Sequence, residues 1–179
     1  MKNLLFLFLS LTIVACNNDD GNDTPENPAD ALPPATLTGE GTFGCLIDGE
    51  PFFPGRFGGD RPSAFYQFVR GAYTLGISAS RGGGEDSQAI IIGGLDIVSG
   101  VETITYPLIS QDSGNFNGLY LLGGGIELRS FTTHENPGTL DITNFTEEII
   151  SGTFEFTVLD NDGTEIRITD GRFDLRYTN

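Results

Sequence analysis

The chain has 179 residues, of which 25 are Asp or Glu and 9 are Lys or Arg, so its formal net charge at pH 7 is −16. Nucleic-acid binding draws its affinity from Lys and Arg side chains that displace counterions from phosphates. The acidic composition therefore excludes nucleic acid as a partner. The length is sufficient for one hydrophobic core without disulfides.

Residues 1–15 have the features of a bacterial signal peptide. Lys2 supplies a short positive region, and an apolar run follows over residues 4–15. A helix over that run would reach only about 18 Å, which is short of a bilayer core of roughly 30 Å. We therefore expect a removable signal peptide here and not a membrane span.

The apolar run ends in the order Ile, Val, Ala, Cys at Ala15-Cys16, and this order resembles a bacterial lipobox. The resemblance implies that a peptidase cuts between Ala15 and Cys16 and that the Cys16 thiol carries diacylglycerol. Two or more acyl chains hold a protein stably at a membrane. We therefore expect a lipid-anchored protein of the cell envelope, at the outer membrane.

Residues 16–41 follow the lipobox as an acidic, proline-rich segment with no basic and no aromatic residue. Such a composition cannot bury enough apolar surface to order the chain, so it predicts a disordered tether. The acids Asp19 and Asp20, close behind Cys16, resemble the export signal of surface-displayed lipoproteins in Bacteroidota. A plain linker on a periplasm-facing lipoprotein is the alternative, and the two faces of the membrane stay open.

Residues 42–179 are predicted to form one all-β domain, because apolar and polar residues alternate with period two. Turn-forming pairs such as Asp48-Gly49, Asp162-Gly163 and Asp170-Gly171 separate the alternating runs. About ten strands joined by short turns favour an antiparallel sandwich or barrel with meander hairpins and no substantial helix. The expected strands are 42–48, 64–70, 73–80, 88–98, 101–108, 118–122, 125–132, 139–143, 153–158, 166–168 and 172–177.

The mature stretch resembles a family of Bacteroidota lipoprotein domains to which no activity is assigned. The resemblance is carried by residues 32–36 and 42–45 near the start, and by residues 150–156 and 168–174 near the end. It covers nearly the full chain and implies an envelope location and no particular chemistry.

Only one histidine, His134, and two cysteines are present, and the lipobox would use Cys16. Cys45 then has no disulfide partner, and its place in an apolar run predicts a buried, inert thiol. His134 lies in a polar stretch before Pro137-Gly138 and is expected in a solvent-facing loop. One His and one buried Cys cannot supply a zinc site, so no cofactor is expected.

The acidic cluster Asp160, Asp162 and Glu165 superficially resembles a calcium loop. Aligning Gly163 with the invariant glycine of an EF-hand puts Val158 and Thr169 at ligand positions, which excludes that motif. Two interpretations of the acidic cluster stay open: a weak surface calcium site formed by the three acids, or a plain hairpin turn.

Two functions fit these observations, and no catalytic residue can be assigned from the sequence. The first is a non-enzymatic binding or structural module whose partner is an envelope protein or glycan. The second is a glycan-acting hydrolase that uses paired carboxylates. An enzyme should bring acids together in a pocket, whereas a binding module should expose aromatic residues or a free sheet edge.

Overall fold

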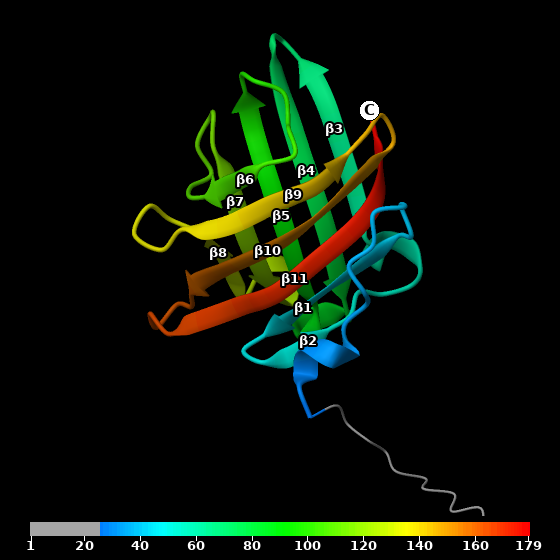
Figure 1. Ribbon diagram of the computed structural model, residues 1–179. Coiled ribbons are helices and arrows are strands. Elements are labelled where there is room, and N and C mark those ends of the chain that lie inside the picture. The colour runs from blue at the N-terminus through cyan, green and yellow to red at the C-terminus, as the bar shows by residue number, and fades with distance from the viewer. Residues whose placement is uncertain (1–25) are drawn as a thin grey trace, which may run out of the picture.

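The computed structural model describes residues 26–179, so the predicted signal peptide, the cleavage site Ala15-Cys16 and the acids Asp19 and Asp20 lie outside the described residues. The described chain is all-β, as the alternation predicts (Figure 1). It also holds four short 3-10 turns: η1 (Pro28–Ala31), η2 (Gly58–Asp60), η3 (Gly84–Asp86) and η4 (Gly123–Gly125). None of the helical segments in residues 26–179 has the length and apolar character to cross a bilayer.

Eleven strands form the sheet. Six of the predicted strands agree with it to within two residues at both ends, whereas the strand predicted at 101–108 begins only at Thr105 and those predicted at 166–168 and 172–177 are one continuous strand. The short second strand is not predicted from the sequence. In chain order the strands are β1 (Thr42–Ile47), β2 (Glu50–Phe52), β3 (Ser63–Val69), β4 (Ala72–Arg81), β5 (Gln88–Ile97), β6 (Thr105–Leu108), β7 (Phe116–Leu122), β8 (Leu128–Phe131), β9 (Gly138–Phe145), β10 (Ile149–Leu159) and β11 (Glu165–Thr178).

The strands close into an eight-stranded barrel in the order β10-β9-β6-β7-β5-β4-β3-β11, with β11 pairing back onto β10. The extra strands β1, β2 and β8 flank this ring. Two seams of the ring are parallel and very short: Leu108 pairs with Phe116, and β11 meets β3 only at Ala64 and Phe65. Between these seams lie two antiparallel sheets whose strands cross in Figure 1.

The barrel interior is filled by the apolar members of the alternating runs. Ile77, Ile90, Leu140 and Ile168 are fully buried and belong to one continuous core. Burying a side chain of this size contributes roughly 1.5–3 kcal/mol, so this set supplies much of the driving force for closure. Cys45 is also fully buried and free, which confirms the predicted packing role of its thiol.

The predicted turn at Asp170-Gly171 is wrong, because β11 runs through it without interruption. The pair forms a β-bulge instead: Asp170 has φ 53°, and the register with β10 shifts between Phe154 and Phe156. A Cβ on Gly171 would lie 2.5 Å from both the ring and the carbonyl oxygen of Phe154. The glycine is needed here because two strands approach each other closely. The Asp-Gly pair that predicts a turn from the sequence therefore forms a β-bulge in the structure.

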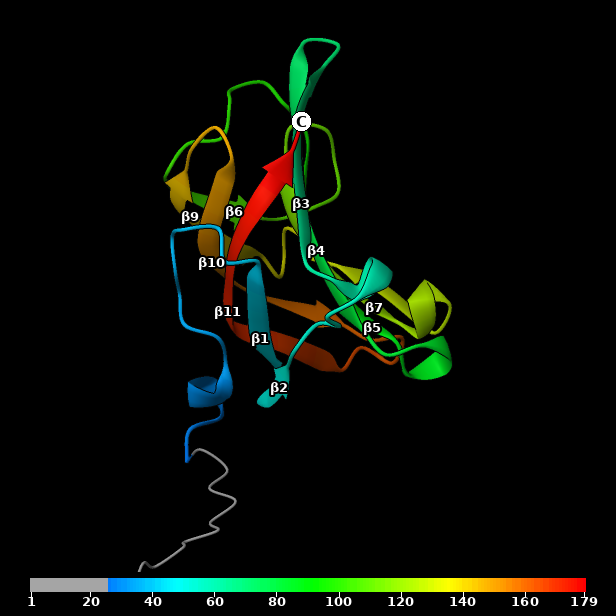
Figure 2. The same ribbon diagram turned by 90° about the vertical axis from the view of Figure 1, so that its right-hand side faces the viewer.

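The predicted disorder is wrong for residues 32–41, which we call the N-terminal strap. Leu32 is only 6% exposed, and Gly44 lacks the side chain that would otherwise clash with Pro33. The strap runs beside β1 and β11 in Figure 2. Its composition cannot reveal this packing, because the groups that hold it come from β10 and β11 at the other end of the chain.

Candidate binding site

Asp174 on β11 is a fully buried carboxylate, and it holds the N-terminal strap. Three strap amides donate to it: Thr38 N at 3.1 Å, Gly39 N at 2.8 Å and Glu40 N at 3.0 Å. The hydroxyls of Thr36 and Ser151 donate to it at 2.6 and 2.7 Å. Burial raises the pKa of Asp174, but these hydrogen bonds outweigh burial and hold the pKa well below its usual range.

This carboxylate is closed off from solvent, and its oxygens are already occupied by protein donors. An acid that catalyses proton transfer must reach the substrate, and Asp174 cannot. Its role is therefore structural: it joins the strap to the barrel wall.

The acids that come closest to a paired-carboxylate site are Glu155 and Asp170. Both line an open pocket of about 380 Å³ that is also lined by Thr139, Thr153 and Arg172. Both carboxylates are exposed to water. A glycoside hydrolase protonates its leaving group with a partly desolvated acid, and this pocket does not offer one.

The three calcium candidates build a hairpin turn between β10 and β11. Oδ1 of Asp160 accepts hydrogen bonds from the amides of Asp162 at 2.9 Å and Thr164 at 2.7 Å. Glu165 forms an ion pair with Arg167 at 2.8 Å. Across residues 26–179, no group of three or more His, Cys, Asp or Glu side chains is arranged to hold a metal ion.

The other residues singled out from the sequence lie where their surroundings predict. His134 is exposed in the loop between β8 and β9. Burial raises the pKa of the Cys45 thiol to about 12, against a smaller opposing effect of Arg81, so the thiolate is scarce at neutral pH.

The most unusual surface is a strand edge at one end of the barrel, which we call the β3 free edge and define as residues 66–69. On one side β3 pairs with β4 over its whole length. On the other side β11 pairs only with Ala64 and Phe65 and then ends. The backbone of residues 66–69 therefore has no strand beside it on that side within the described chain.

Two other edge strands of the described chain, β2 and β8, carry protective residues, and the β3 free edge does not. The short edge strand β2 contains Pro51, and the four-residue strand β8 carries Arg129. The β3 free edge has neither proline nor charge, and two of its side chains are exposed apolar groups, Phe68 at 62% and Val69 at 52%. Natural proteins usually protect such edges, so an unprotected one points to a partner.

Four aromatic rings pack together at the β3 free edge, and we call them the aromatic wall: Tyr66, Phe68, Tyr73 and Phe145. The rings of Tyr66 and Tyr73 are stacked, with centroids 5.1 Å apart and planes within 2°. Phe68 packs on Tyr73 at 4.7 Å, and Phe145 meets Tyr66 edge to face at 5.2 Å. The Tyr66 hydroxyl accepts a hydrogen bond from the Val101 amide at 3.0 Å, which fixes the ring.

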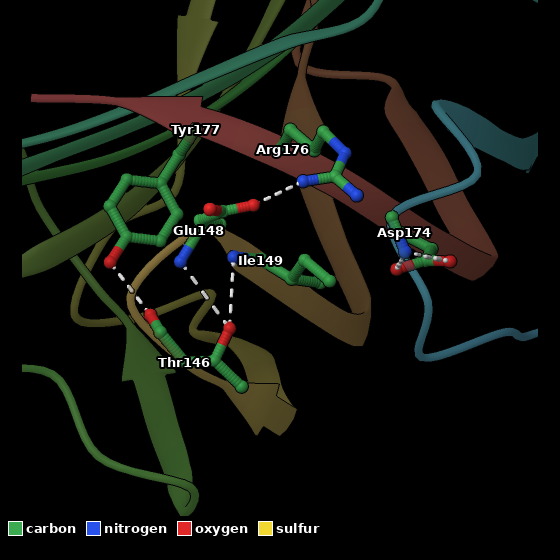
Figure 3. Close-up of polar contacts among 7 residues, drawn as sticks. Thr146, Glu148, Ile149, Asp174, Arg176 and Tyr177 are labelled. Atoms are coloured by element: carbon green, nitrogen blue, oxygen red, sulfur yellow. Dashed lines mark hydrogen bonds and ion pairs between the residues drawn. The ribbon is translucent and has the colours of Figure 1, made fainter.

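Tyr177 extends this wall and is locked from behind by the turn between β9 and β10 (Figure 3). Its hydroxyl donates to the Thr146 carbonyl oxygen at 2.7 Å. The Thr146 hydroxyl in turn accepts from the Ile149 amide at 3.1 Å, and Arg176 pairs with Glu148. These contacts fix the position of the Tyr177 ring.

A pocket of about 540 Å³ lies at the β3 free edge. Its lining is Tyr66, Gln67, Phe68, Val69, Tyr73 and Asn179. Asn179 directly follows β11, whose residues Tyr177 and Thr178 pair with Ala64 and Phe65. A strand over 64–70 is predicted from the sequence, but which part of its edge is paired is not.

Comparisons with protein families, with curated proteins and with solved structures find no match. The assignment of the site therefore rests on its geometry.

Proposed function

We propose that the chain is a lipid-anchored cell-envelope module, without enzymatic activity, that binds an extended segment of a partner protein at the β3 free edge. The observation that carries the proposal is the unprotected edge itself, with exposed Phe68 and Val69 beside a pocket. Strand addition gives affinity through backbone hydrogen bonds and specificity through pockets for alternate side chains.

The edge suits a peptide better than it suits a second copy of the chain. Each copy carries a formal charge of −16, so two copies repel each other. Glu148, in the turn between β9 and β10, is paired with Arg176, whereas Glu147 in the same turn is in neither ion pair of the described residues. An apolar extended peptide with a basic residue at the end that faces Glu147 complements these surroundings.

The predicted anchor on Cys16 fits this use of the edge. The described chain begins near η1, and the β3–β4 hairpin projects at the opposite end of the barrel in both views (Figures 1 and 2). A lipid attached upstream of η1 would leave the hairpin pointing away from the membrane. The lipobox and the resemblance to Bacteroidota lipoprotein domains support an outer-membrane location, on either face.

Selection from a displayed library of random seven-residue peptides tests the proposal. The bait is the full mature chain, purified in detergent. We expect selected peptides to be apolar and β-branched with Lys or Arg at an end, and to bind at least tenfold more weakly to Phe68→Lys. The matched control is Ile126→Lys, because Ile126 is 92% exposed and directly follows η4, away from the edge.

Two results would contradict the proposal. One is the recovery of no peptide above background from the wild-type chain. The other is equal weakening of binding by Phe68→Lys and Ile126→Lys, which would indicate attachment to any exposed apolar residue. Thermal unfolding of both variants shows whether each remains folded.

A further inference from the structure

A second pocket, separate from the β3 free edge, lies between the N-terminal strap and the loop that joins β2 to β3. Its volume is about 500 Å³, and its lining includes Ala31, Pro33, Phe53, Arg56, Arg61 and Pro62. We call it the Arg56–Arg61 pocket. Its walls come from residues far apart in sequence, so it forms only in the folded chain.

The charge of the pocket is opposite to that of the molecule. Acids outnumber bases by 25 to 9 in the chain, yet no acid lines this pocket. The ion pairs of the described residues join Arg167 to Glu165 and Arg176 to Glu148. Arg56 and Arg61 belong to neither pair, and both are exposed to solvent. Two guanidinium groups are therefore available to a ligand.

The loop that carries the two arginines is fixed at both ends by Ser80 on β4. The Gly55 amide donates to the Ser80 carbonyl oxygen at 2.8 Å, and the Ser80 hydroxyl donates to Oδ1 of Asp60 at 2.8 Å. The second bond directs the Asp60 carboxylate toward β4, where it lines a different pocket together with Ser80. The nearest acid on the loop therefore does not line the Arg56–Arg61 pocket.

The facing wall is the N-terminal strap, which is held by buried Leu32 and by the Asp174 hydrogen bonds. Pro33 lines the pocket from this side. Phe53 adds an apolar surface, since its side chain is 44% exposed and lines the same pocket. Fixed walls reduce the entropy that a ligand must offset on binding.

We propose that the Arg56–Arg61 pocket binds an oxyanion, phosphate or carboxylate, that is carried on a compact ring or apolar body. The planar guanidinium group recognises both oxyanions through paired hydrogen bonds. The Phe53 surface takes the ring or apolar part of the ligand. A membrane lipid headgroup and a soluble acidic metabolite or sugar share this chemistry, and the probes below separate them.

Titration of the ¹⁵N-labelled mature chain, followed by NMR, tests the proposal with three anionic probes. They are monomeric dihexanoyl phosphatidic acid, glucose 6-phosphate and glucuronate, compared with the neutral dihexanoylglycerol and glucose. We expect at least one anionic probe to shift the amides of the pocket at concentrations where its neutral counterpart does not. Binding of the lipid probe alone would assign the pocket to a headgroup, and binding of either sugar probe to a soluble ligand.

Arg56→Gln and Arg61→Gln should each weaken the bound probe about tenfold, because each removes a charge-assisted hydrogen-bond donor. Arg129→Gln is the matched control, since Arg129 is an exposed arginine on β8 that does not line the pocket. The proposal is overturned if no anionic probe binds, or if Arg129→Gln weakens binding as much as the pocket variants do. These results are independent of peptide binding at the β3 free edge.

Discussion

Replacing Asp174 by Asn tests whether one buried charge holds the N-terminal strap to the barrel. The side chain keeps its shape and loses its charge. The least disruptive placement puts the new NH₂ group on the Oδ1 side, where the Ser151 hydroxyl can rotate to accept from it. The donors from Thr36, Thr38 and Glu40 then still meet an oxygen, but a neutral one. The Gly39 amide keeps its contact with Oδ2 at 2.9 Å but loses its Oδ1 acceptor at 2.8 Å to the new NH₂ group.

A hydrogen bond to a charged group contributes roughly 1.5–3 kcal/mol, against about 0.5–1.5 kcal/mol for a neutral pair. Four bonds that each lose somewhat under 1 kcal/mol lower the free energy of unfolding by about 3 kcal/mol. For a domain of this size, that corresponds to a decrease in Tm of about 10 °C. Ser151→Ala removes a single donor and should cost about 1–2 kcal/mol.

The effect depends on pH in a definite direction. Because the folded pKa of Asp174 is lowered, its charge stabilises the fold above the unfolded pKa of about 4. That stability is lost as the pH falls from there toward the folded pKa. The difference between wild type and Asp174→Asn should therefore be constant from pH 5 to 8 and shrink below about pH 4.

Urea unfolding at several pH values measures the difference, and hydrogen exchange at the amides of Thr38, Gly39 and Glu40 reports on the strap alone. We expect the strap amides to lose protection in Asp174→Asn even where the barrel stays folded. A loss of stability below 0.5 kcal/mol, with strap protection unchanged, would refute the role assigned to Asp174.

Three further predictions concern the bulge, the buried thiol and the anchor. Gly171→Ala should destabilise the fold by about 2 kcal/mol in urea unfolding, because its Cβ would meet Phe154, whereas Gly83→Ala, with open space around it, should be neutral. A destabilised Gly83→Ala and a neutral Gly171→Ala would contradict the close approach. Cys45 should resist iodoacetamide at pH 8 in the native chain and react fully in urea, as its pKa of about 12 requires; rapid native labelling would show an accessible thiol. Cys16→Ser should abolish the labelling of this chain in cells that are fed palmitate, and it should leave an unprocessed precursor. Labelling that persists would refute the prediction that Cys16 carries the lipid.

The strands could be predicted from the sequence because each is a local pattern of alternating side chains. Runs such as 73–80 and 153–158 have one apolar face, and that face is buried in the barrel. The closure of the barrel is not local. It depends on the β11–β3 seam at Ala64 and Phe65, and no pattern within either strand specifies that partner.

The functional features were harder to predict for the same reason. The N-terminal strap looks disordered until Asp174, 135 residues from Gly39, is placed beside it. The β3 free edge depends on the register in which β11 pairs with β3, and the Arg56–Arg61 pocket is lined by the strap and by the loop between β2 and β3, which are far apart in sequence. One feature of the sequence does point to the β3 free edge: the apolar residues Phe68 and Val69 stand directly before the Arg70-Gly71 turn, and edge strands rarely expose such residues.

Hydrogen exchange at residues 66–69 in two settings tests the central claim most directly. In the purified mature chain, the amides of the β3 free edge that point away from β4 should exchange rapidly, because no strand protects them. In intact cell envelopes containing the same chain, an added partner strand should slow their exchange, while the exchange of the amide of exposed Gly124 stays unchanged. Equal, rapid exchange of residues 66–69 in both settings would contradict a bound partner at this edge.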